Sequence, residues 1–181
     1  MLSEHFQKPN LPVPVSLTDV RLPVIPISYL TGDATHPVGD GPKILVHVCN
    51  DIGAWGRGFV VAISRRWPEP EKHYRKWHRD GANIPFELGQ VQFVPVSDDI
   101  TVANLIGQHS IRSTQSSTPV RYEAIRAGLQ RVASHARTTA ASVHMPRIGC
   151  GLAGGSWNVV EGIVREELVA KGVAVVVYDL I

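Results

Sequence analysis

This sequence has few cysteines, no large excess of positive or negative charge, and no long apolar runs. Cys49 and Cys150 are the only cysteines among 181 residues, and neither has a neighbour at metal-binding spacing. We therefore expect neither a disulfide-stapled fold nor a metal site. Lys and Arg number 18 against 16 Asp and Glu, a net charge of +2, which does not by itself indicate a protein dedicated to nucleic acid.

The sequence also lacks the segments that membrane entry requires. No apolar stretch is long enough to span a bilayer, and the first residues do not show a basic segment followed by an apolar run. We therefore expect a cytoplasmic protein without membrane contact. Internal repeats and low-complexity blocks are absent as well, and the length suits one domain. Our expectation for the oligomeric state, on which the sequence is silent, is a monomer.

Proline is not scarce, but it is concentrated at the start. Pro9, Pro12, Pro14 and Pro23 fall within the first 24 residues. Their fixed φ angles and missing amide donors oppose both helices and central strands. We expect residues 1–24 to form a proline-rich arm and residues 25–181 to form the folded domain.

Short β-branched runs alternate with helical periods through the rest of the chain. The expected strands are 44–49, 91–96, 101–106, 143–145 and 173–178, after a first strand that ends before Gly32. The expected helices are 58–67, 69–77, one opened by Thr118 and Pro119 and running to Ala136, and one from Ser156 to Gly172. This alternation predicts an α/β fold with helices on both faces of a largely parallel or mixed sheet.

The densest basic stretch runs from Lys72 to Arg79 and includes Tyr74 and Trp77. Its four Lys and Arg residues could contact a polynucleotide together with the aromatic rings. Alternatively, they form the solvated face of a helix that packs through those rings. We favour the second interpretation, because nucleic-acid-binding domains carry a more one-sided charge.

Two glycine-rich loops stand out. The first loop, residues 50–58, reads Asn-Asp-Ile-Gly-Ala-Trp-Gly-Arg-Gly, and the second loop, residues 147–155, reads Arg-Ile-Gly-Cys-Gly-Leu-Ala-Gly-Gly. Each follows an expected strand and precedes an expected helix. Glycine lets the backbone approach a ligand closely, and the free amides of a helix N-terminus favour an anion. Together the loops predict a diphosphate site at the carboxyl ends of the strands, unless their glycines only make tight turns.

The second loop also matches the dinucleotide fingerprint G-x-G-x-x-G over residues 149–154. Asp179 ends the following strand, where the acid that holds a ribose hydroxyl is expected. However, the sequence given ends at Ile181, so no later strands complete a Rossmann half on that side. We rank a redox role below simple nucleotide binding.

Several motifs together resemble the macrodomain family. They are Gly32-Asp33-Ala34-Thr35, the loop beginning at Asn50, and the run from Met145 to Leu152 followed by Trp157. The resemblance runs from about residue 27 onward, in particular to the branch with the terminal ADP-ribose protein glycohydrolase and the macrodomain of the chromatin remodeller ALC1. It implies a three-layer α/β/α sandwich on a mixed, mostly parallel sheet, with ADP-ribose as the ligand and no cofactor or metal.

The resemblance also implies roles for individual residues. Asp33 would accept from the adenine amino group, although on its own it could simply form a turn after glycine. Asn50 would meet the distal ribose, the second loop would wrap the pyrophosphate, and Tyr178 or its neighbours would line the adenine pocket. The implied binding residues are Gly32, Asp33, Ala34, Asn50, Gly53, Gly56, Arg57, Gly58, Gly149, Cys150, Gly151, Leu152, Ala153, Gly154 and Tyr178.

The catalytic groups are less clear from the resemblance. Hydrolytic relatives use a lysine after the Asn loop and an aspartate after the Gly-Leu pair. Here the lysine position falls near Gln108 or His109, and the aspartate position is Ala153. We expect water to attack the anomeric carbon, oriented by fixed dipoles and by the phosphate of the substrate.

His109 is the leading candidate acid or base because imidazole titrates near neutral pH, although an exposed loop histidine is the more common outcome for such a residue. Gln108 and Asn50 are the other catalytic candidates. Asp51 and Cys150 are weaker ones. A helix N-terminus beside Cys150 would lower its thiol pKa, whereas a buried small residue would be inert.

Two classes of function remain: a hydrolase that removes mono-ADP-ribose from proteins, and a reader that binds ADP-ribose without turnover. Related domains also act on ADP-ribosylated nucleic acid or on other ADP-ribose derivatives. We expect the hydrolase, with ADP-ribose and ADP-ribosylated macromolecules, chiefly proteins, as its binding partners.

Overall fold

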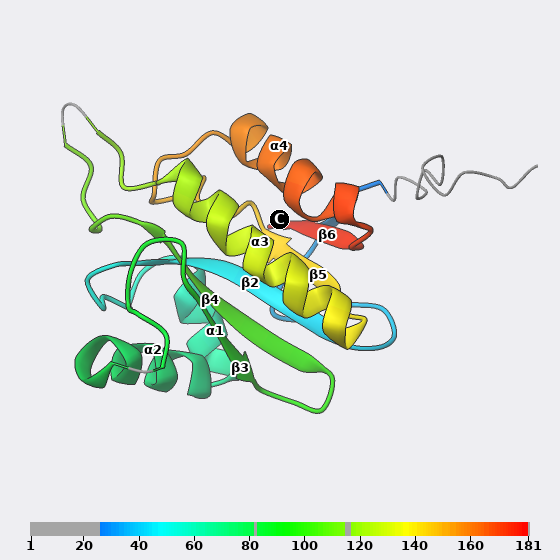
Figure 1. Cartoon of the computed structure of the whole chain (residues 1–181), viewed down its shortest axis with the longest axis horizontal. Coiled ribbons are helices and arrows are strands. Elements are labelled where there is room, and N and C mark those ends of the chain that lie inside the picture. The colour runs from blue at the N-terminus through cyan, green and yellow to red at the C-terminus, as the bar shows by residue number, and fades with distance from the viewer. Residues whose placement is uncertain (1–25, 82, 115–116, 181) are drawn as a thin grey trace, which may run out of the picture.

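The chain folds around one mixed sheet that has helices on both faces (Figure 1). The computed structural model describes residues 26–180, apart from residue 82 and residues 115–116, so the expected arm at 1–24 lies outside the described residues. In chain order the elements are β1 (Ser28–Thr31), β2 (Lys43–Asn50), α1 (Phe59–Arg66), α2 (Glu69–Asp80), β3 (Val91–Pro95), β4 (Ile100–Gln108), α3 (Tyr122–Thr139), β5 (Ser142–Pro146), α4 (Trp157–Glu167) and β6 (Val175–Asp179), with a 3₁₀ turn at Val169–Lys171.

The sheet has six strands in the order β1-β6-β5-β2-β4-β3. Its pairs are parallel, except that β3 runs antiparallel to β4 at one edge. Strands β2 and β5 are therefore neighbours, and the loops that follow them leave the sheet side by side at the same end. This confirms the predicted mixed, mostly parallel α/β sheet.

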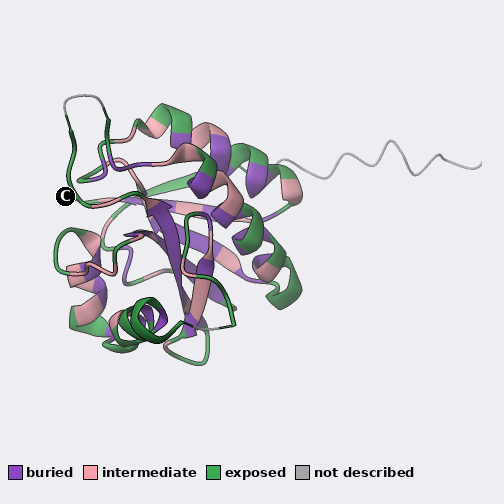
Figure 2. Cartoon of the chain, turned by 60° about the vertical axis from the view of Figure 1, so that its left-hand side comes forward, coloured by how far each residue is buried: buried purple, intermediate pink, exposed green. Residues whose placement is uncertain are grey.

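Alternate residues of β2 explain the three layers. Ile44 and Val46 join a core packed beneath α3 and α4, whereas Leu45 joins a core with residues of α1. Cys49 joins Tyr74 and Trp77 of α2. Side chains that alternate across a strand thus bury both faces of the sheet. Figure 2 shows the buried residues on the strands and on the helix sides turned toward them.

The basic stretch of α2 forms the solvated face of a helix that packs through its aromatic rings, as the favoured interpretation predicted. Tyr74 and Trp77 are buried, and the Lys and Arg residues of the stretch are exposed. Arg75 pairs with Glu71 at 2.8 Å, and its guanidinium donates to the carbonyl of Trp55 at 3.0 Å. The helix therefore packs through its aromatic rings and supports the first loop from outside.

The start of α3 differs from the prediction. The helix begins at Tyr122, with Arg121 as its N-cap residue, and not at Thr118. Val120 forms a β-bridge with Gln108, and the carbonyl of Pro119 accepts from the amide of His109 at 2.8 Å. Pairing of residues 119 and 120 with the end of β4 keeps them out of the helix, so local capping signals do not decide where it begins.

The expected last helix divides into two parts. Ser156 is the N-cap residue of α4 as predicted, but α4 ends at Glu167 and a 3₁₀ turn follows. Gly172 then stops that turn at a left-handed φ of 77°. Among the described residues, no helix is long and apolar enough to cross a membrane.

Candidate functional site

The first loop joins β2 to α1, and the second loop joins β5 to α4. Both loops contain glycines in the left-handed region, with φ of 71° at Gly53 and 77° at Gly58 in the first loop. The second loop has 72° at Gly149 and 74° at Gly154. Residues with a side chain rarely adopt these angles, so the loop paths require glycine at these positions.

Two cavities open between these loops. The first cavity, of about 570 Å³, is lined by the first loop and by residues 111–113. The second cavity, of about 270 Å³, is lined by both loops. They share wall residues and so form one continuous cleft across the ends of β2 and β5. The shared residues are Val48, Arg57, Val60, Gln108 and Leu152.

The walls of this cleft are cationic. Arg57 lines both cavities and Arg112 lines the first. Neither guanidinium has an ion-pair or hydrogen-bond partner within the described part of the chain. No carboxylate lines either cavity in that same part of the chain. Such a cleft attracts an anion.

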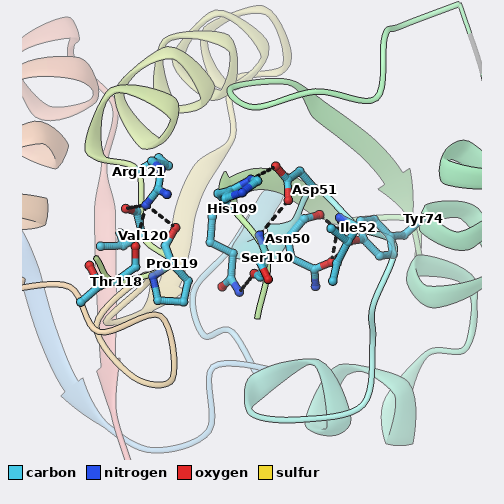
Figure 3. Close-up of polar contacts among 11 residues, drawn as sticks. Asn50, Asp51, Ile52, Tyr74, His109, Ser110, Thr118, Pro119, Val120 and Arg121 are labelled. Carbon is cyan, nitrogen blue, oxygen red and sulfur yellow. Dashed lines mark hydrogen bonds and ion pairs between the residues drawn. The ribbon is translucent and has the colours of Figure 1, made fainter. Parts of the chain in front are cut away.

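Asn50 organises the first loop. Its side-chain Nδ2 donates to the carbonyl of Ala54 at 2.5 Å, and its Oδ1 accepts from the amides of Ile52 and Ala54 at 3.2 and 2.9 Å. The hydroxyl of Tyr74 donates to the carbonyl of Asn50 at 2.5 Å (Figure 3). Asn50 lines the first cavity with a side chain fixed by its own loop.

Gln108 and His109 lie differently with respect to the cleft. Gln108 lines both cavities, and its Nε2 donates to the carbonyl of Ser110 at 2.9 Å. His109 lines neither. Its side chain is 59% exposed, and its Nδ1 lies 2.7 Å from a carboxylate oxygen of Asp51, toward which the ring points in Figure 3. The geometry therefore favours Gln108 over His109 as the group that reaches a bound ligand.

Asp51 is held as a carboxylate. Burial alone would raise the pKa of Asp51, but hydrogen bonds from the amide of Ser110 and from His109 outweigh it and lower the pKa. The Ser110 amide donates to Oδ1 at 2.8 Å.

Asp33 forms the turn after β1. Its Oδ1 accepts from the amide of Thr35 at 2.9 Å, and its Oδ2 lies 3.3 Å from Nδ1 of His36. Burial acts to raise the pKa of Asp33, but the hydrogen bonds from Thr35 prevail and lower it. The turn-forming alternative is therefore seen in the structure. The carboxylate is still 45% exposed, so it remains accessible to a ligand.

Tyr178 lies in the core and lines neither cavity. Its ring is 4% exposed, its hydroxyl accepts from the amide of Val38 at 3.1 Å, and it lies 2.9 Å from Nδ1 of His144. Burial lowers the pKa of His144 to about 4, so this histidine is neutral near pH 7. The predicted role of Tyr178 in lining the adenine pocket therefore has no support from a contact with either cavity.

In the second loop, the environment of Cys150 differs from the expected one. Cys150 is half-buried, and its Sγ donates to the carbonyl of Ile148 at 3.2 Å. Burial raises the pKa of Cys150, opposite to the lowering expected from a helix N-terminus. The alternative interpretation of an inert small residue agrees better with this position.

Asp179 is not placed as a ribose-binding acid. Its carboxylate accepts from Nε and Nη2 of Arg147 at 2.5 and 2.7 Å, a bidentate pair that joins the ends of β5 and β6. The side chain of Arg147 also packs over the rings of Tyr29 and Trp157. Because Arg147 occupies the Asp179 carboxylate, this arrangement does not favour the dinucleotide interpretation of the second loop.

About half of the predicted binding residues line the cleft. Those that do are Asn50, Gly56, Arg57, Gly58, Gly149, Gly151, Leu152 and Ala153. Those that line neither cavity are Gly32, Asp33, Ala34, Gly53, Cys150, Gly154 and Tyr178. The prediction missed Ile111, Arg112 and Ser113, because a polar segment after a strand carries no signal that it folds over a neighbouring loop. Within the described residues, no group of His, Cys, Asp and Glu is arranged to hold a metal ion.

Comparisons with known proteins agree with this architecture. No protein-family model matches the chain. A solved structure of a macrodomain protein from Streptomyces coelicolor is 55% identical, with a TM-score of 0.76, and the match covers 85% of this chain and 99% of that one. The ADP-ribose 1''-phosphate phosphatase of Candida albicans is 26% identical over 77% of this chain and 92% of its own length.

A further relative is the chromodomain-helicase-DNA-binding protein 1-like of Mus musculus, which is 32% identical over 84% of this chain. This chain spans only 17% of that protein, so the similarity concerns one part of a much longer polypeptide. The solved structure from Streptomyces, which is 55% identical and matched over 99% of its length, shows the family. The chain belongs to the macrodomain family.

Proposed function

We propose that this chain binds ADP-ribose in the joined cavities and hydrolyses the bond between ADP-ribose and a modified protein side chain. The observation that carries the proposal is the convergence of two glycine-rich loops on one cleft, at whose centre Arg57 has no counter-charge among the described residues. A diphosphate supplies that charge, and the loop amides can donate hydrogen bonds to its oxygens.

The residues that line the two cavities suggest how the ligand lies. The pyrophosphate is placed where Arg57 borders both cavities, and the distal ribose in the first cavity beside Asn50 and Gly56. The adenosine half then extends along the second loop toward the turn at Asp33. An exposed carboxylate there can accept from the adenine amino group.

For hydrolysis, a water molecule attacks the anomeric carbon as the bond from that carbon to the acceptor oxygen breaks. A carboxylate acceptor leaves as an anion, so its departure requires no acid. The proton of the water passes to a phosphate oxygen of the substrate, since no carboxylate of the described chain lines the cavities. The fixed amide dipoles of Asn50 and Gln108 orient the reacting groups.

The same shortage of acidic side chains favours a second candidate, a reader that binds ADP-ribose without turnover. Hydrolysis of a phosphate ester of ADP-ribose is a further alternative, suggested by the name of the Candida relative. The two main candidates share the ligand and differ only in whether release exceeds the spontaneous rate.

Two measurements test the proposal in sequence. Calorimetry should give a dissociation constant in the micromolar range, about 8 kcal/mol of binding free energy, and no heat of binding would refute the ligand assignment. Single-turnover assays at saturating enzyme should then release ADP-ribose from an automodified protein faster than the spontaneous rate. Binding without such release would establish the reader.

Asp33→Ala should weaken ADP-ribose binding about tenfold, because the only group assigned to the adenine amino group is removed. The control is Asp33→Asn, whose Oδ1 can still accept from the amide of Thr35 and keep the turn. If the carboxylate reads adenine, Asn should lose nearly as much affinity as Ala. An Asn variant with wild-type affinity would assign Asp33 to the turn alone.

A further inference from the structure

Asp51 ties the first loop to the segment that follows β4. Its amide donates to the carbonyl of Gln108 at 3.1 Å. Its carboxylate accepts from the amide of Ser110 at 2.8 Å and meets Nδ1 of His109 at 2.7 Å (Figure 3). The Asp51 side chain is 17% exposed, so these contacts form in a largely enclosed position. Three interactions at one residue thus join two walls of the cleft.

The residue that Asp51 holds has an unusual backbone conformation. Ser110 has a φ of 61°, one of only two positive φ angles at non-glycine positions in the described parts of the chain. L-residues with a side chain rarely adopt this region, so neighbouring contacts must maintain it. Here the amide of Ser110 is held by Asp51 and its carbonyl by the Gln108 side chain, at 2.9 Å.

The turn at Ser110 sets the direction in which the next residues leave β4. Ile111, Arg112 and Ser113 follow it directly, and all three line the first cavity. Ile111 is 51% exposed, and Arg112 is one of the two unpaired cations described above. This wall of the first cavity is therefore connected to the rest of the site through a strained turn.

We infer that Asp51 is a positioning residue for the distal end of the ligand: it holds the turn at Ser110, which places Ile111 and Arg112 on the wall of the first cavity. This inference rests on the proposed function, since it assigns the distal ribose to that cavity. His109 then acts as a partner that steadies the Asp51 carboxylate, in agreement with its position outside both cavities.

The test compares ADP-ribose with ADP, which lacks the distal ribose and has a free terminal phosphate in its place. Asp51→Ala should weaken ADP-ribose binding about tenfold or more and leave ADP binding within about twofold of the wild type. Asp51→Asn should retain most of the affinity. Its amide oxygen can still accept from Ser110, and its amide nitrogen can donate to the other tautomer of His109.

A second substitution tests the turn itself. Glycine adopts a positive φ without strain, so Ser110→Gly in the Asp51→Ala background should recover ADP-ribose affinity by at least about threefold. The same Ser110→Gly change in the wild type should alter affinity by less than about twofold. Recovery by a residue that lacks any side chain would identify the turn, rather than the charge of Asp51, as the element that matters.

Hydrogen exchange provides a readout without ligand. Amides of residues 110–114 should exchange faster in Asp51→Ala than in the wild type or Asp51→Asn, with thermal melts confirming that each variant is folded. Equal losses of ADP and ADP-ribose affinity in Asp51→Ala would overturn the inference. The inference would also be overturned if Asp51→Asn lost as much turnover as His109→Ala, since that result indicates that the charged pair acts in catalysis.

A different outcome concerns the proposed function. Wild-type protein that binds ADP but not ADP-ribose would refute the proposed function, and the exchange data would still decide whether Asp51 holds the turn.

Discussion

Gly151→Glu should abolish ADP-ribose binding, with a loss of at least about 100-fold, while the protein stays folded. Gly151 lines the second cavity, and no heavy atom lies within 4 Å of the position that a Cβ atom would take. Its φ is also outside the left-handed region. A side chain there therefore enters the cavity without straining the fold, and its carboxylate would face the phosphates of the ligand.

Gly151→Gln is the matched control, because it adds nearly the same volume without the charge. If phosphate lies beside Gly151, Gln should weaken binding less than Glu, and higher salt should reduce the difference between them. Calorimetry at two salt concentrations measures both effects, and thermal melts check the fold. Wild-type affinity in the Glu variant would place the diphosphate elsewhere.

Gly128→Val should lower the melting temperature by about 6–12 °C, which corresponds to about 3 kcal/mol for a domain of this size. Gly128 lies on the buried side of α3, where a Cβ atom would come within 2.4 Å of Cγ of Leu105 in β4. Leu105 is fully buried, so its side chain has little room to move. Overpacking should therefore push α3 away from the sheet.

Gly162→Val on α4 is the control for the low helix propensity of valine. No heavy atom lies within 4 Å of a Cβ atom placed at Gly162, so this variant should melt close to the wild type. A second check combines Gly128→Val with Leu105→Ala, which frees space at the contact and should recover part of the lost stability. Equal melting temperatures for Gly128→Val and Gly162→Val would show that the contact can relax.

Most of the fold could be predicted from local signals, because tertiary contacts did not override them. The apolar run at 44–49 became β2, and the alternating stripe beginning at Tyr122 became α3. The start of α3 could not be predicted, because Thr118 and Pro119 form a sound capping signal. They stay outside the helix because Val120 forms a bridge with Gln108 and the carbonyl of Pro119 accepts from the amide of His109.

The positions of the two glycine-rich loops at the site could be predicted from the sequence. Which side chains face the cleft could be predicted less well. The choice between Gln108 and His109 depends on a register shift, in which Cys49 pairs with Ile106 but Asn50 pairs with Gln108. One residue of β4 is therefore skipped, and simple alternation along the strand fails there. Such a bulge arises from pairing between distant segments, so no local pattern reveals which of the two residues faces the cleft.

Leu152 lies where the two cavities meet. This leucine, shared by both cavities, is 67% exposed, and a Cβ atom on Gly58 would lie 3.4 Å from its Cδ1. A molecule that occupies both cavities therefore passes close to this hydrocarbon side chain and to the bare backbone of Gly58. Arg57 and Gln108, which also line both cavities, add polar groups beside this apolar contact, so the middle of the cleft suits a linkage that is both narrow and charged.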